Sequence, residues 1–200
     1  MADPSARPSA RPSASSVGAS GDALAVALRS AFGSEFYDLR ATLPRHKTAC
    51  YGTRRLAEIV NITLHHSAMP VTGTWERAAL YHVRAHGWPG IGYGMGIYAD
   101  GRVCLLNDPA VISYHAGGIW NRRGFGLCVM GNYEAKSASD ALWGRIVATA
   151  GVVGEWLGRD VPLIGHRDVA ATACPGRHLY ARLKADARSV FAVGVVDSDA

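Results

Sequence analysis

The chain lacks the features that would place it in a membrane or among small disulfide-stabilised proteins. Its 200 residues contain no apolar run of about 18 residues, the length that a membrane-spanning helix needs. The first 20 residues lack the apolar core of a signal peptide, which predicts a protein made in the cytoplasm. The four cysteines form no CxxC pair and are too dispersed for a disulfide framework, so we expect reduced thiols at Cys50, Cys104, Cys128 and Cys174.

The chain also has few charged residues, and they form no basic or acidic run. Charged residues make up 18% of the sequence and hydrophobic residues 48%, which suits one globular domain with a substantial core. The formal net charge of +5 favours anionic polymers in general. No motif supports nucleic-acid binding, and we expect no nucleic-acid partner.

The sequence divides into four segments. Residues 1–20 contain the low-complexity phrase ARPSARPSA and are predicted to be a disordered tail. Residues 21–58 are an extension with a short helix at 22–33, capped by Asp22 and ended by Gly33. Residues 59–192 carry the main domain, and 193–200 are predicted to be a loose tail.

Strand and helix patterns alternate in the main domain. An apolar, β-branched run predicts a strand at 59–64, and further strands are predicted at 92–98, 102–106, 125–130 and 161–164, with a hairpin turn at Asp100-Gly101. Helical periodicity and caps predict helices at 75–86, 138–157 and 179–191. The pattern predicts an α/β fold: a single domain whose central mixed β-sheet is flanked by α-helices.

Two of the eight histidines stand where ligands gather in such folds. His65 and His166 each follow the end of a predicted buried strand. The segment GHRDVAATACPG at 165–176 adds Cys174 after a second imidazole. Two imidazoles and a thiolate suit Zn²⁺, and three protein ligands leave one position open, as in catalytic sites. From spacing alone, a buried free cysteine near a capping histidine is the alternative.

Four blocks of sequence resemble one enzyme family. ITLHHSA at 62–68 and the 165–176 segment resemble the two metal motifs of the zinc-dependent N-acetylmuramoyl-L-alanine amidases, which include the T7-type phage lysozyme and the peptidoglycan recognition proteins. GWPGIGYGMGIYADGRV at 87–103 resembles the central hairpin of that family. YHAGG at 114–118, followed by GFGLCVMGN at 124–132, resembles its next strand. The resemblance runs in order from about 59 to 183.

The resemblance assigns roles to individual residues. His65, His166 and Cys174 match the zinc ligands, and Tyr93 matches a catalytic tyrosine. Thr172 falls where phage enzymes carry a lysine and catalytic recognition proteins a threonine, so its share of the catalytic work is open. Five further positions are expected to border the substrate groove: His66, Gly94, Met95, His115 and Asn132.

The implied function is zinc-dependent hydrolysis of the amide bond between N-acetylmuramic acid and L-alanine in bacterial peptidoglycan. A phage or prophage endolysin is expected, because the N-terminus predicts cytoplasmic synthesis and a separate pore would then release the enzyme to the wall. The alternatives are a peptidoglycan-recognition module that does not cut, and a bacterial autolysin or recycling amidase. A monomer is expected, and the sequence leaves the preferred stem peptide undecided.

Overall fold

A six-stranded mixed sheet forms the centre of the structure, a computed structural model that describes residues 14–186. The strands lie in the order β1-β4-β3-β5-β2-β6, where β3 and β4 are antiparallel and the other neighbours are parallel. Their bounds are Phe36–Asp38 (β1), Asn61–His66 (β2), Met95–Ile97 (β3), Val103–Leu105 (β4), Gly124–Val129 (β5) and Leu163–Gly165 (β6). The α/β fold with a mixed sheet is therefore confirmed.

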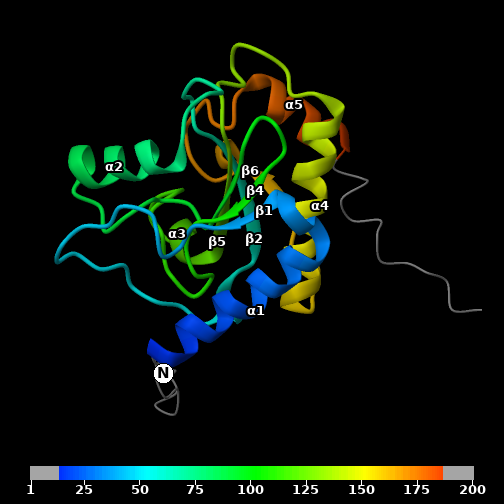
Figure 1. The fold of residues 1–200 in the computed structure, drawn as a ribbon. Helices are drawn as coiled ribbons and strands as arrows, with labels where there is room; N and C mark the ends of the chain where they lie inside the picture. Colours follow the sequence, from blue (N-terminus) through cyan, green and yellow to red (C-terminus); the bar gives the residue numbers. More distant parts are fainter. Residues whose placement is uncertain (1–13, 187–200) are drawn as a thin grey trace, which may run out of the picture.

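Five α-helices accompany this sheet in the described part of the chain: α1 (Ala14–Phe32), α2 (Trp75–His86), α3 (Trp120–Arg123), α4 (Asp140–Leu157) and α5 (Arg177–Asp186). Figure 1 shows α2 on one side of the sheet, with α1 and α4 next to each other on the opposite side. No helix in residues 14–186 is long and apolar enough to cross a membrane.

The two faces of the sheet differ in chemistry because side chains alternate along each strand. On β2, Ile62 and Leu64 belong to the larger hydrophobic cluster, together with buried residues of α1, α4 and α5. We call this side the aliphatic face. The intervening residues Asn61, Thr63 and His65 are buried on the other side, which we call the polar face. A smaller cluster that includes Trp75 of α2 covers part of the polar face.

The predicted helices 75–86 and 138–157 match α2 and α4 closely. Thr74 accepts a hydrogen bond from the backbone N–H of Arg77, and Ser139 accepts one from that of Leu142, so each helix has an N-cap. Each helix ends at a glycine with a left-handed backbone, which only glycine adopts without strain. Local signals therefore fixed both ends of these helices.

The N-terminal extension departs from the prediction. Helix α1 begins at Ala14, so Asp22 lies inside it and is not its cap. Leu24 and Leu28 are fully buried in the larger cluster, which makes the extension part of the core. Strand β1 was not predicted, because a strand of three residues shows no clear alternation and β4, with which it pairs, lies far along the chain. Residues 1–13 and 187–200, which include the predicted tail at 193–200 and the end of the helix predicted at 179–191, lie outside the described residues.

Candidate metal centre

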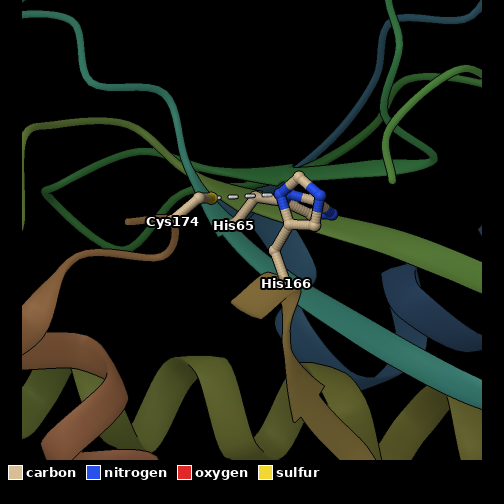
Figure 2. A group of neighbouring side chains, drawn as sticks. All are labelled: His65, His166 and Cys174. Atoms are coloured by element: carbon tan, nitrogen blue, oxygen red, sulfur yellow. Dashed lines mark hydrogen bonds between the residues drawn. The ribbon is translucent and has the colours of Figure 1, made fainter. Parts of the chain in front are cut away.

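Three side chains that could bind a metal meet at the carboxyl end of the parallel strands β2 and β6. His65 is near the end of β2, His166 follows β6 directly, and Cys174 comes from the next loop. Their ligand atoms all lie within 4.8 Å of one another. Figure 2 shows the two imidazoles and the thiol gathered around one point. The sequence prediction that these three residues lie together agrees with this geometry.

The spacing of the three donors fits a zinc ion. Zinc bonds of about 2.0–2.1 Å to nitrogen and about 2.3 Å to sulfur, arranged as a tetrahedron, place the two atoms about 3.5 Å apart. The Sγ atom of Cys174 lies 3.5 Å from Nδ1 of His65. Two imidazole nitrogens and one sulfur are also the mixed donor set that zinc accepts. Three ligands leave the fourth tetrahedral position open.

Burial sets the protonation of these ligands. It lowers the pKa of His65 well below its ordinary value and also lowers the pKa of His166, so both imidazoles are neutral at pH 7 and keep a lone pair for a metal. Burial raises the pKa of Cys174 to about 11. The thiol is therefore protonated without a metal, and metal binding has to release that proton.

The loop that carries Cys174 is held by short-range contacts. The carbonyl of Cys174 accepts a hydrogen bond from the backbone N–H of Arg167 at 3.1 Å, and its own N–H donates to the hydroxyl of Thr172 at 3.1 Å. Gly176 has φ of +90°, and a Cβ there would lie 2.4 Å from the backbone of Tyr133. The loop therefore requires glycine at 176.

Each histidine ligand has a hydrogen-bond partner behind it. Nε2 of His65 lies 3.0 Å from Nδ1 of His115, and Nε2 of His115 lies 3.1 Å from the carbonyl oxygen of Gly124. The backbone of Ala116 interacts with the ring of His166 and opposes the lowering of its pKa. Partners of this kind fix the ring orientation and tautomer of metal-binding histidines.

Tyr93 lies beside the ligands. Its ring centroid is 5.3 Å from that of His65. Burial raises the pKa of its hydroxyl well above the ordinary value, with further contributions from Cys128 and Cys174. The phenol is therefore protonated at neutral pH and can donate a hydrogen bond. Thr172 is half-buried, and its oxygen already accepts from the N–H of Cys174, so its hydroxyl proton is directed elsewhere.

The residues predicted to border a substrate groove are scattered. Met95 is 1% exposed in the larger hydrophobic cluster, and a Cβ on Gly94 would strike the ring of Phe125 at 2.1 Å. Neither position offers a side chain to a substrate in this structure. Asn132 is exposed, and its side chain accepts from the backbone N–H of Glu134 in a local turn.

The other two predicted groove residues lie close to the ligands. His66 is half-buried, and its Nδ1 accepts from the backbone N–H of Tyr133 at 3.0 Å. Burial lowers its pKa, so it is a neutral imidazole near neutral pH. His115 is 7% exposed and lies behind His65, where it contacts the ligand itself.

Sequence reasoning missed two residues that shape the centre. Arg54 is 1% exposed, and its guanidinium donates to the carbonyls of Pro109, Arg122 and Gly124 at 2.6–2.8 Å. Burial lowers its pKa to about 9. Asn121 accepts three backbone N–H groups, those of residues 115–117, at 2.8–2.9 Å. No local signal distinguishes either residue from a surface arginine or a turn asparagine, because their partners are set by the tertiary fold.

The sequence is similar to a known protein family and to several of its members. The family model described as N-acetylmuramoyl-L-alanine amidase matches residues 55–177. Peptidoglycan recognition protein 1 of Bos taurus is 34% identical over 107 residues, which cover 52% of this chain and 56% of that protein. The N-acetylmuramoyl-L-alanine amidase of Homo sapiens is 33% identical over 107 residues, 52% of this chain and 18% of that protein. The matches thus span little more than half of the first relative and a small part of the second.

Solved structures share the fold. Bumblebee PGRP-SA superposes with a TM-score of 0.66 at 23% identity, covering 74% of this chain and 93% of that chain. The amidase LysC from Clostridium intestinale gives a TM-score of 0.59 at 22% identity, covering 77% and 96%. PGRP-LE, solved in complex with tracheal cytotoxin, a monomeric diaminopimelic acid-type peptidoglycan, gives 0.66 at 18%, covering 76% and 94%. At these identities the structural likeness establishes the fold alone.

Proposed function

Because the chain belongs to the N-acetylmuramoyl-L-alanine amidase family, we propose that it is a zinc-dependent enzyme that hydrolyses the amide bond between N-acetylmuramic acid and L-alanine in peptidoglycan. One observation carries the proposal: His65, His166 and Cys174 present three zinc-type donors within 4.8 Å of one another. The donors come from separate segments of the chain, and packing alone gives no reason for them to converge. Three ligands with one open position are typical of catalytic zinc sites, whereas structural sites have four.

The residues around the donors suit amide hydrolysis. A zinc ion held by these three side chains would polarise the scissile carbonyl and lower the pKa of a water molecule. Tyr93, whose ring lies beside His65 and whose hydroxyl is protonated, would donate a hydrogen bond to the carbonyl oxygen as that oxygen becomes negative. Thr172 holds the backbone of Cys174 with its oxygen and retains a proton to donate. The hydroxyl of Tyr93 or Thr172 could also pass a proton to the leaving amine.

The second candidate is a module that binds peptidoglycan without cutting it. Relatives of the chain include peptidoglycan recognition proteins as well as an amidase, so family membership does not separate the two functions. The complete donor set and the neighbouring Tyr93 favour hydrolysis, because a pure recognition module has no need for either.

Product analysis tests the proposal directly. The full-length protein, loaded with zinc, is incubated with muropeptides of defined stem sequence, and the products are identified by mass spectrometry. We expect a free lactyl carboxyl on the sugar and a free amino terminus on L-alanine, and loss of both after treatment with a chelator. Binding of the muropeptides without any cleavage would support the recognition module instead.

A pair of cysteine variants assigns the activity to the metal centre. Cys174→Ser removes a ligand, and we expect hydrolysis to fall by roughly 10³-fold or more, because several kcal/mol of transition-state stabilisation depend on the metal. Cys50→Ser is the matched control, since Cys50 is exposed and its sulfur contacts only the nearby carbonyl of Thr48. Cleavage by Cys174→Ser at the wild-type rate would rule the metal mechanism out.

The biological setting stays a prediction. We infer that the protein acts as a phage or prophage endolysin, made in the cytoplasm and released to the wall through a separate pore. Lysis of host cells that express the protein only when a pore-forming partner is co-expressed would support this role. Lysis without such a partner, or no effect on the wall, would favour an autolysin or a recycling amidase.

A further inference from the structure

His115 is the feature of the centre whose role is not explained by metal binding or by substrate contact. It is 7% exposed, and no metal-binding group includes it among the described residues. We propose that His115 is a positioning residue that fixes the tautomer and ring orientation of the zinc ligand His65. This inference rests on the zinc site proposed above, and its subject is what holds the site in shape.

The direction of the hydrogen bonds follows from one fixed acceptor. The carbonyl oxygen of Gly124 can only accept, so Nε2 of His115, 3.1 Å away, carries the proton. In a neutral imidazole Nδ1 of His115 is then an acceptor, and Nε2–H of His65, 3.0 Å away, donates to it. That leaves the lone pair of His65 on Nδ1, the atom that lies 3.5 Å from Cys174 Sγ. The chain of contacts therefore presents the ligand atom that the zinc site needs.

Two glycines of β5 form the slot in which the imidazole of His115 lies. A Cβ on Gly126 would lie 2.8 Å from Cγ of His115, and a Cβ on Gly124 would lie 2.9 Å from its Cε1. Both distances are too short for real atoms, so any larger residue at either position would displace the ring. The sequence Gly124-Phe125-Gly126 thus leaves room on the polar face of β5 for this ring beside the hydroxyl of Thr63, while Phe125 fills the core on the opposite face.

Hydrogen bonds from Arg54 and to Asn121 hold the backbone on both sides of the His115 ring. Arg54 donates to the carbonyl of Gly124 at 2.6 Å, the same oxygen that His115 uses. Asn121 accepts the backbone N–H groups of His115 and Ala116, which fixes the segment that carries the imidazole. Buried polar groups cost free energy unless they are paired, so a fully bonded arrangement of this kind is rigid.

The same segment supports the second histidine ligand. The backbone of Ala116, the residue next to His115, interacts with the ring of His166. One short stretch therefore contacts both imidazoles, through the side chain of His115 for His65 and through the backbone of Ala116 for His166. Loss of such supporting partners lowers metal affinity by about 10- to 100-fold in metalloproteins.

Zinc affinity tests the assignment. We would measure the dissociation constant of the full-length protein by competition with a chelator of known affinity. His115→Phe keeps a ring of similar size in the slot but neither donates nor accepts, and we expect the dissociation constant to rise by about 10- to 100-fold. His115→Gln retains one acceptor and one donor, and we expect it to recover most of the affinity. An unchanged dissociation constant in His115→Phe would overturn the proposal.

A second buried histidine supplies the control. His82 is 9% exposed, and its Nδ1 accepts from the backbone N–H of Gly92. His82→Phe also removes a buried imidazole, but one whose ring contacts Tyr93 and none of the three ligands in the described residues, so we expect zinc affinity within about twofold of wild type. If His82→Phe weakened zinc binding as much as His115→Phe, the effect would be general destabilisation, and the proposal would fail.

The slot itself offers a test that leaves His115 in place. Gly126→Ala should displace the ring, whereas Gly144→Ala on α4 adds a methyl group with no heavy atom within 4 Å. In the nitrogen-edited NMR spectrum of the zinc-loaded protein, we expect the Nε2–H signal of His65 in wild type and Gly144→Ala, and its loss or broadening in Gly126→Ala. An unchanged signal in a folded Gly126→Ala variant would contradict the positioning role.

The two proposals fail in different ways. If the wild-type protein binds no zinc, the proposed function falls, while the tautomer of His65 still reports on its contact with His115. If the wild type binds zinc and cleaves muropeptides, but His115→Phe and Gly126→Ala match it in affinity and in the His65 signal, only the positioning role falls.

Discussion

The two faces of one sheet are built for different purposes. On β5, Phe125, Leu127 and Val129 point to the aliphatic face and pack with α1 and α4, whereas Gly124 and Gly126 alternate with them on the polar face. The polar face holds small or hydrogen-bonding residues and carries the ligand His65 on the neighbouring strand β2. Successive residues of the same strand therefore serve stability and chemistry in turn, because a strand alternates its side chains.

This division has a physical basis. Large apolar side chains on one face bury enough surface to stabilise the sheet. The other face can then hold groups that cost stability when they are buried, such as imidazoles, a thiol and the guanidinium of Arg54, provided that each finds a partner. The comparison predicts that substitutions on the aliphatic face change the free energy of unfolding, and that substitutions on the polar face change zinc affinity or turnover.

The largest expected change in the free energy of unfolding comes from a substitution on the aliphatic face. Leu127 is 1% exposed and pairs in register with Leu64. Leu127→Ala should lower the free energy of unfolding by about 2–5 kcal/mol, because it removes buried methyl groups and leaves a cavity. Urea denaturation measures this loss. Zinc affinity of the folded protein should stay within about twofold of wild type.

Cys128 is the matched control, because it follows Leu127 and points to the opposite face. Cys128→Ala removes a single sulfur atom and should cost roughly 1 kcal/mol or less. An equal loss of stability in Leu127→Ala and Cys128→Ala would contradict the proposed difference between the faces, since both faces would then contribute equally to the free energy of unfolding.

The next effect concerns turnover. Tyr93→Phe removes the hydroxyl that we place at the reacting carbonyl, and kcat should fall by about 10²- to 10³-fold, or about 2.7–4 kcal/mol. Zinc affinity should not change, since Tyr93 is not a ligand. Tyr98→Phe is the control: its hydroxyl accepts from the backbone N–H of Trp75 at 3.4 Å. A kcat within threefold of wild type in Tyr93→Phe would assign the catalytic hydrogen bond elsewhere.

The sequence predicted the parts of the molecule that depend on neighbours along the chain. Helices α2 and α4 carry caps and glycine stops beside them, and the strand that contains His65 is rich in apolar and β-branched residues. The three donors were found because they lie in two blocks of sequence that resemble the metal motifs of the family. Strand β1 and the buried position of Met95 could not be found this way, since their partners are distant. The contact between His115 and His65 is of the same kind: no local pattern distinguishes a groove histidine from one behind a ligand.

The third prediction is that zinc binding releases a proton from the metal centre. The pKa values of His65 and His166 are lowered, so both rings are neutral near pH 7, while the pKa of Cys174 is raised to about 11. Zinc must therefore displace one proton, from the thiol. Affinity should rise by at least about tenfold, or about 1.4 kcal/mol, for each pH unit between about 7 and 9, because fewer protons compete for the sulfur.

Titration calorimetry in buffers of different ionisation enthalpy measures the protons released. We expect about one proton per zinc ion from the thiol at pH 7.5, and up to one more from a zinc-bound water, whose pKa approaches about 7. Release of more than two would mean that an imidazole is also protonated without metal. An affinity independent of pH would mean that Cys174 is already ionised, or that it is not a ligand.

The smallest effects come from the two helix caps, one on each side of the sheet. Ser139→Ala at α4 and Thr74→Ala at α2 each remove one side-chain hydrogen bond to a free backbone N–H, at 3.2 and 3.3 Å in the wild type. Each should lower the free energy of unfolding by about 1 kcal/mol. Neither cap contacts a ligand, so zinc affinity should stay within about twofold of wild type. Because the two changes are chemically alike, any difference between the variants reports on the helices themselves. Weaker zinc binding in Thr74→Ala alone would show that α2 also supports the metal centre, through the contact of Trp75 with the polar face of the sheet.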